Sequence, residues 1–201
     1  MTLPPSDRTA TKFRNDLPRM LPHLQLDAQG AAMLTDCDGS LLALDRLEHA
    51  GLLIEATRLV AHALPSREAV WWACACSRHT GASGIDPDNE TKLREMAEEW
   101  VRRQTDAHRR AAMKEAETMG FRSPEAWAAV AAFWSGDSMA PPEAPKVPPQ
   151  PHFTGLAVAG AVALAAVRGQ ATLRDARLRR FLASARDIAS GGVGRIEVED
   201  S

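Results

Sequence analysis

Hydrophobic residues recur every three or four positions along most of the chain, which is the period of an amphipathic α-helix. Residues 124–134 show this period most clearly. The ends of this helix are also marked, because Ser123 suits an N-cap before it and Gly136 suits a helix end after it. A second stripe lies in residues 53–63, before Pro65, and consists of Leu53, Ala56, Val60 and Ala63. Every element that can be assigned from residue 40 to 191 is a helix, so the pattern predicts an all-α fold.

About eight helices are expected, joined in pairs by short connections. We therefore expect stacked antiparallel helical hairpins at residues 41–64, 66–103, 105–134 and 154–189. Ser66 is expected to cap the helix that follows it. The charged stretch after residue 88 is expected to break near Gln104, because an unbroken helix of about 31 residues would be unusually long. Residues 51–63 resemble a tetratricopeptide half-repeat, so the stacking is predicted to be weakly tetratricopeptide-like.

The helical domain is expected to span residues 40–191. Residues 1–39 carry four prolines before residue 23, which predicts an arm of short helical segments. A proline-rich strap, residues 138–152, is expected to lie across the domain near Trp127 and Trp134. Residues 192–201 form an acidic tail, with a sequence that also suits a short strand.

Residues 154–167 are apolar on all sides, which predicts a central, buried helix. Their uncharged run, GLAVAGAVALAAV, is 13 residues long, whereas a membrane-spanning helix needs about 20. We therefore expect no insertion into a membrane. An apolar pocket beneath this helix would suit a small-molecule sensor, which is one alternative function.

Charge and cysteine content narrow the function classes. Lys and Arg number 24 and Asp and Glu number 26, so the net charge is −2 and no overall basic field predicts nucleic-acid binding. Three cysteines are too few for a disulfide framework, and the N-terminus lacks an apolar signal-peptide core. We expect a cytoplasmic protein.

The stretch EAVWWACACSRH, residues 68–79, raises the question of a metal site. On a helix, Cys74 and Cys76 point roughly 160° apart, so they cannot bind one ion. Cys76 and His79 could form half of a zinc site, but the remaining cysteine and histidines are scattered singly along the sequence. The stretch therefore predicts a core helix, and no metal and no cofactor are expected.

The stretch AAMLTDCDGSLL, residues 31–42, resembles motif I of the haloacid dehalogenase phosphohydrolases. That resemblance implies a nucleophile at Asp36, an acid/base at Asp38 and a magnesium ion between them. The family also needs a parallel sheet, and the downstream sequence predicts only helices. A phosphohydrolase using Asp36 and Asp38 is thus a second alternative, and an ordinary turn is the expected structure.

The chain as a whole resembles a family of uncharacterised bacterial proteins defined as a domain of unknown function. The segments that carry this resemblance lie between about Leu41 and Gly191 and include REAVWWAC, EEWVRRQTDAHRRAAM, AAFWSGDSMAPP and PHFTGLAVAGAVALAAV. The resemblance implies no catalytic activity. It implies an association with type VI secretion gene clusters.

These observations favour a non-enzymatic helical protein-interaction module. The resemblance adds the expectation of an accessory, adaptor or chaperone role in a type VI secretion system, with secretion components as partners. Interface hot spots favour Trp and Arg. The residues expected to bind a partner are Trp71, Trp72, Arg78, His79, Trp100, Arg103 and Trp134.

Overall fold

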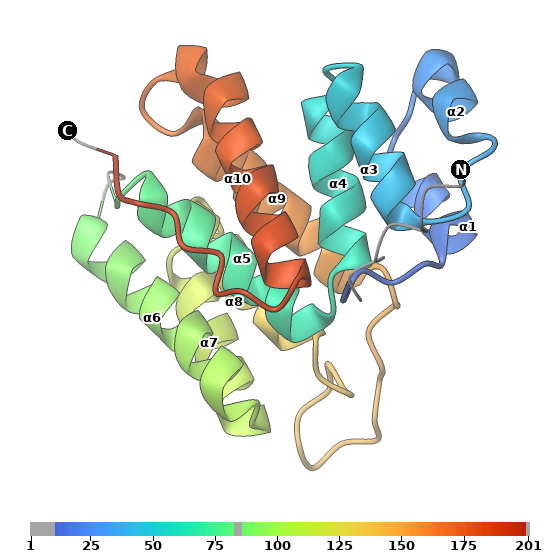
Figure 1. Cartoon of the computed structure of the whole chain (residues 1–201). Coiled ribbons are helices and arrows are strands. Elements are labelled where there is room, and N and C mark those ends of the chain that lie inside the picture. Colours follow the sequence, from blue (N-terminus) through green and yellow to red (C-terminus); the bar gives the residue numbers. More distant parts are fainter. Residues whose placement is uncertain (1–10, 83–85, 200–201) are drawn as a thin grey trace, which may run out of the picture.

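The computed structural model describes residues 11–82 and 86–199. Within these ranges the chain forms ten α-helices and two short 3-10 helices, with no strand (Figure 1). The prediction of an all-α fold is therefore confirmed. The elements are α1 Leu17–Met20, η1 Leu21–His23, α2 Ala28–Leu34, α3 Ser40–His49, α4 Leu53–Ala63, α5 Ser66–His79, α6 Pro87–Arg103, α7 Asp106–Thr118, α8 Pro124–Trp134, α9 Phe153–Val167, η2 Ala171–Leu173 and α10 Arg174–Ala189.

The core is built around α8 and α9, which pack against each other. Helix α8 also contacts α5, α6 and α7, and α9 also contacts α4, α5 and α10. Both helices are rich in alanine, so neighbouring helices can approach closely without leaving voids. The consecutive pairs α3–α4, α5–α6, α7–α8 and α9–α10 are each in contact. The tetratricopeptide-like character of this stacking stays a prediction.

Helix boundaries follow the sequence signals with one exception. The break near Gln104 is confirmed: this residue has a φ of 52°, and the Thr105 hydroxyl accepts from the His108 amide at the start of α7. Ser123 caps α8 by accepting from the Ala126 amide at 3.2 Å. The expected cap at Ser66 is wrong, because Ser66 is already the first residue of α5 and no side chain caps that helix.

Helix α5 is a core helix, as the sequence predicts. Trp72, Cys74 and Cys76 are fully buried, and the Trp72 indole Nε1 donates to the Phe181 carbonyl of α10 at 2.8 Å. Burial raises the pKa of both the Cys74 and Cys76 thiols, so neither forms a thiolate at neutral pH. The composition of this stretch reflects packing on several sides.

Helix α9 departs from the prediction of burial on all sides. Its inner face is buried, but Leu156, Leu164 and Val167 are exposed along the outer face. Over the described residues, no single helix is long and apolar enough to cross a membrane. Helix α9 reaches such a length and composition only when it is joined with η2 and α10, and this pair is bent by 117°.

The arm and the strap contact the body differently. Phe13, Leu17, Met20 and Leu24 of the arm are buried against the helical core, and the described part of the arm contains the short elements α1, η1 and α2. The strap between α8 and α9 does not lie across the domain as expected. Most of its residues are exposed, and Figure 1 shows it projecting from the end of the bundle as a long loop.

Candidate functional site

The C-terminal segment runs back along α10 and across α5 in an extended conformation (Figure 1). Three hydrogen bonds join it to α5. The Trp71 indole donates to the Val193 carbonyl at 2.8 Å, the Glu199 amide donates to the His79 carbonyl at 2.8 Å, and the His79 Nδ1 binds the Glu197 carbonyl. We call residues 193–199 the tail, and the surface of α5 and α10 that holds them the tail site.

Gly194 forms the main contact between the start of the tail and α10. Its amide donates to the Asp187 carboxylate at 2.8 Å, and its carbonyl accepts from the Ser184 hydroxyl at 2.7 Å. It has a φ of +65°, and a Cβ there would lie 2.4 Å from the Ile188 side chain. Only glycine fits this position, so the close approach of the tail is specified by its sequence.

At the far end of the tail, the Glu199 carboxylate lies among Arg177, His79 and Arg180, which we call the Arg177 socket. This carboxylate accepts from Arg177 at 3.0 Å and 3.1 Å from Nε, and at 2.6 Å from a terminal nitrogen. The His79 Nε2 lies 3.2 Å from the same carboxylate, and Arg180 lies 3.9 Å away at the rim. The Arg177 hydrogen bonds hold the pKa of Glu199 below its ordinary value.

The Arg177 side chain is also fixed by main-chain contacts outside the tail. Its guanidinium donates to the carbonyls of Ala166 and Arg168, at 3.2 Å and 2.5 Å, where α9 ends. Arg177 is only 5 % exposed. A buried charge is costly unless a counter-charge accompanies it. The socket therefore requires an acidic occupant, and the chain supplies Glu199.

A second ion pair lies behind the socket. Arg168 forms two hydrogen bonds to the Glu125 carboxylate, at 2.9 Å and 2.5 Å, and also donates to the Gly81 carbonyl. Glu125 is fully buried at the start of α8, and Glu90 of α6 lies 3.6 Å from Arg168. This pair joins the ends of α5, α6, α8 and α9, and thereby fixes the backbone that positions Arg177.

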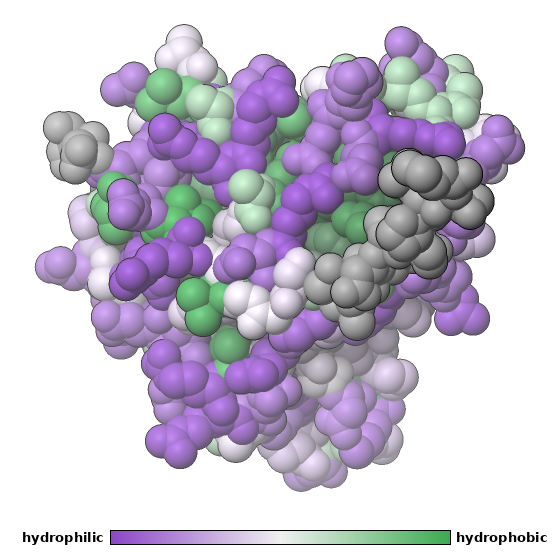
Figure 2. Space-filling view, viewed as in Figure 1, coloured by the Kyte–Doolittle hydropathy of each residue, from purple (hydrophilic) through white to green (hydrophobic). Residues whose placement is uncertain are grey.

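A cavity of about 1050 Å³ opens beside the tail. Its walls are the end of α5, the connection after α9, the exposed side of α10 and the tail itself. Outside the tail it is lined by three arginines, Arg168, Arg177 and Arg180, and by Asp187 of α10; the tail adds Arg195, Glu197 and Glu199. Figure 2 shows that the face crossed by the tail is mainly hydrophilic, with separate hydrophobic patches. The tail site therefore favours a polar, acidic occupant.

The structure brings together only part of the expected binding set. Trp71 and His79 contact the tail directly, and the Arg78 guanidinium lies 5.4 Å from the Trp71 ring centre. Trp72 and Trp100 are buried, so neither indole presents an exposed edge.

The other two expected binding residues lie apart from the tail. Arg103 is exposed at the end of α6, where it pairs with Glu99 at 2.9 Å. Trp134 packs on Phe153, with the ring centres 5.0 Å apart. These two side chains therefore belong to other surfaces.

Asp36 and Asp38 have no phosphohydrolase context. Both are exposed in the short connection between α2 and α3. The fold of the described residues provides no sheet edge at which a nucleophile and an acid/base could converge. The motif is a turn that leads into α3.

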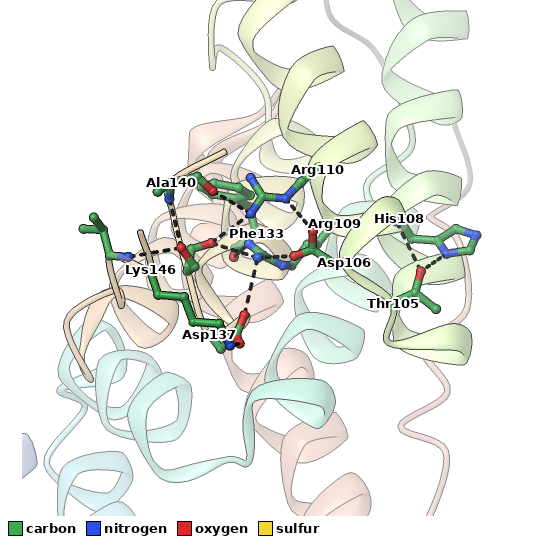
Figure 3. A network of polar contacts seen from close by, with 11 residues as sticks. Thr105, Asp106, His108, Arg109, Arg110, Phe133, Asp137, Ala140 and Lys146 are labelled. Atoms are coloured by element: carbon green, nitrogen blue, oxygen red, sulfur yellow. Dashed lines mark hydrogen bonds and ion pairs between the residues drawn. The ribbon is translucent and has the colours of Figure 1, made fainter. Parts of the chain in front are cut away.

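The strap is anchored by a polar network at the end of α8 (Figure 3). Arg109 of α7 is 2 % exposed and donates to the carbonyls of Phe133, at 3.0 Å, and Ser138, at 2.8 Å. A Cβ on Gly136 would lie 2.2 Å from the Arg109 Nε, so this glycine makes room for the guanidinium. The hydrogen bonds from Arg109 to Phe133 and Ser138 hold the stretch FWSGDS, residues 133–138, and fix where the strap begins. We call this set of contacts the Arg109 clamp.

Sequence reasoning missed Arg177 and Glu199. Arginines interleaved with Asp175 and Asp187 are typical of a solvated helix face, but Arg177 is only 5 % exposed. A signal was present: Arg177 lies one turn before Phe181 and two turns before Ala185, both buried, so it borders the apolar stripe. No such signal exists for Glu199, because an extended tail has no helical period.

Comparison with known proteins identifies the family of this chain. The model of a family described as "Family of unknown function (DUF6931)" matches residues 43–189, which is well over half of the chain. No curated protein and no solved structure matches. Over residues 11–82 and 86–199, no group of three or more His, Cys, Asp or Glu side chains is arranged to hold a metal ion.

Proposed function

Because this chain belongs to DUF6931, a family of unknown function, we propose its function from its own surface. It is a non-enzymatic helical protein-interaction module that binds an extended, acidic segment of a partner protein at the tail site. In the free protein its own tail occupies that site. Binding of a partner then requires the partner segment to replace the tail.

One observation carries this proposal: the tail is held as a peptide ligand would be. Its main chain bonds to Trp71, Ser184 and His79, and its acidic side chain enters the Arg177 socket. Main-chain bonds give affinity for extended segments, and a side-chain pocket gives selectivity. Ile196 packs against the core, three positions before Glu199. The segment recognised therefore has an aliphatic residue followed by a glutamate three positions later.

We further propose that the module is a cytoplasmic accessory, adaptor or chaperone of a type VI secretion system. The family resemblance set out from the sequence supports this part. The tail site supports the general role, because an adaptor must hold and release protein segments. A secretion component with an aliphatic residue three positions before a glutamate is the expected partner.

Affinity capture from the native host tests both parts. The bait is the full chain with Glu199→Lys, which places a like charge in the Arg177 socket and displaces the tail. Partner recovery is expected to rise several-fold over the wild type, because the site no longer has an intramolecular competitor. Adding Arg177→Gln to Glu199→Lys should abolish recovery, whereas adding Arg179→Gln, at an exposed neighbouring position, should not.

The outcomes separate the two parts of the proposal. A partner recovered with Glu199→Lys and lost with Arg177→Gln supports the module, and its identity decides the secretion assignment. Recovery that is the same for all baits contradicts the tail site. Circular dichroism of each bait confirms that the helices persist.

A further inference from the structure

Three histidines that are far apart in the sequence meet on the side of the bundle where the N-terminal arm docks. His23 ends η1, His62 lies in the last turn of α4, and His152 directly precedes α9. The rings of His23 and His152 are stacked, with centres 4.1 Å apart and planes at 12°. The ring of His23 lies 5.4 Å from that of His62. His23 thus contacts both partners.

The surroundings of these rings are poor in negative charge. Two adjoining cavities, of about 410 Å³ and 190 Å³, share His23 and His62 in their walls. The charged and titratable side chains that line them are Arg14, Asp16, Arg19, Arg58, His23, His62 and His152. The single carboxylate, Asp16, lies 3.2 Å from Arg19. Arg58 donates to the Leu24 carbonyl and has Glu55 at 4.0 Å.

His62 is pressed against α9. A Cβ on Gly155 would lie 2.2 Å from the His62 Nδ1, so glycine is needed for the ring to pack there. Burial, followed by the proximity of His23 and His152, lowers the pKa of His62 to about 4. Burial and His152 also lower the pKa of His23. The rings of His23 and His62 are therefore neutral imidazoles at pH 7.

We propose that His23, His62 and His152 form an acid-sensitive latch that holds the arm, residues 12–24, on α4 and α9. Neutral imidazoles stack and bury each other. Protonated imidazoles repel each other and the three nearby arginines, and the two nearby carboxylates, Asp16 and Glu55, already pair with Arg19 and Arg58. Opening separates η1 from α4 and α9, and it exposes the arm side chains that pack on the core.

The direction of the pH effect follows from linkage. The docked arm lowers the pKa of His62, so the open state binds more protons and is favoured as the pH falls below 6.5. With a pKa of about 4 when docked and its ordinary 6.5 as the upper limit when open, His62 alone raises the opening constant by at most about 20-fold between pH 7 and pH 5. His23 adds to this. The latch shares no residue with the tail site, so it stands independently of the proposed function.

Hydrogen exchange of the full chain, read by mass spectrometry and corrected for intrinsic rates, tests the latch. Between pH 7 and pH 5, protection of residues 12–26 should fall at least about tenfold relative to α8. In the variant His23→Gln/His62→Gln/His152→Gln, the loss of protection over the same pH range should be less than about a third of the wild-type loss on a logarithmic scale. The control His49→Gln, an exposed histidine of α3, should behave as the wild type.

Two results would overturn the proposal. One is an equal pH response of the arm in the wild type and in the triple variant. The other comes from the wild type alone: in an NMR titration of the imidazole resonances, a His62 that titrates at or above its ordinary pKa of 6.5 contradicts the latch. The second measurement decides the question even if the triple variant fails to fold.

Discussion

Replacing Arg168 with methionine is expected to lower the free energy of unfolding by about 3–5 kcal/mol, because Glu125 is left buried without its cationic partner. Glu125 is 0 % exposed, and the two hydrogen bonds from Arg168 satisfy its carboxylate. Methionine fills similar space but supplies no charge. Urea denaturation followed by circular dichroism gives the change directly.

The double variant Glu125→Leu/Arg168→Met distinguishes a lost charge partner from lost packing. Removing both charges removes the uncompensated Glu125 carboxylate, so this variant should recover part of the stability lost by Arg168→Met. The contact between Arg168 and Glu90, 3.6 Å in the wild type, stays lost in both variants. The matched control is Arg174→Met, because Arg174 is exposed and pairs with its exposed neighbour Asp175. Its effect should stay within about 0.5 kcal/mol. A double variant as unstable as Arg168→Met would contradict the explanation.

Replacing Arg109 with methionine is expected to cost about 3 kcal/mol, because the guanidinium makes two charge-assisted hydrogen bonds to buried main-chain carbonyls. Those carbonyls, at Phe133 and Ser138, lie on either side of the point where α8 gives way to the strap. Arg109 also pairs with Asp106. Loss of the clamp should therefore free the strap as well as destabilise the fold.

Two readouts separate these effects. Urea denaturation reports the loss of global stability, and limited proteolysis at Lys146 reports release of the strap. Cleavage is expected to be faster in Arg109→Met than in the wild type at denaturant concentrations where both proteins are folded. Arg174→Met serves again as the control, because Arg174 is exposed and pairs with Asp175, away from the clamp and from Lys146. It should change stability by less than about 0.5 kcal/mol. Equal cleavage of wild type and Arg109→Met would show that the clamp does not hold the strap.

Much of the fold could be predicted because helical periodicity records burial directly. The stripe of α10, for example, contains Leu178, Phe181 and Leu182, and all three are fully buried. The helix break at Gln104 and Thr105 was predicted correctly because helix ends depend on local backbone and side-chain chemistry. These features involve residues a few positions apart, and one sequence is enough to read them.

The tail site could be predicted only in part, because its contacts join distant residues. Trp71 bonds to Val193, 122 positions away, and Arg177 receives Glu199 from a segment without a period. The predicted position of the strap was wrong for a related reason. Its prolines indicated an extended chain, but the direction of that chain depends on the hydrogen bond from Arg109 to the Ser138 carbonyl. The histidines that seemed scattered meet at one place for the same reason.

The central claim, that the tail site binds extended acidic segments, is tested most directly with the tail as a separate peptide. A fluorescent peptide of residues 191–201 is titrated into the chain ending at Ser190, which keeps all ten described α-helices. We predict saturable one-to-one binding, weakened about 10- to 150-fold in the Glu199→Gln peptide because a charge-assisted hydrogen-bond set is lost. Absence of binding to the folded, truncated chain, or equal binding of both peptides, would contradict the account.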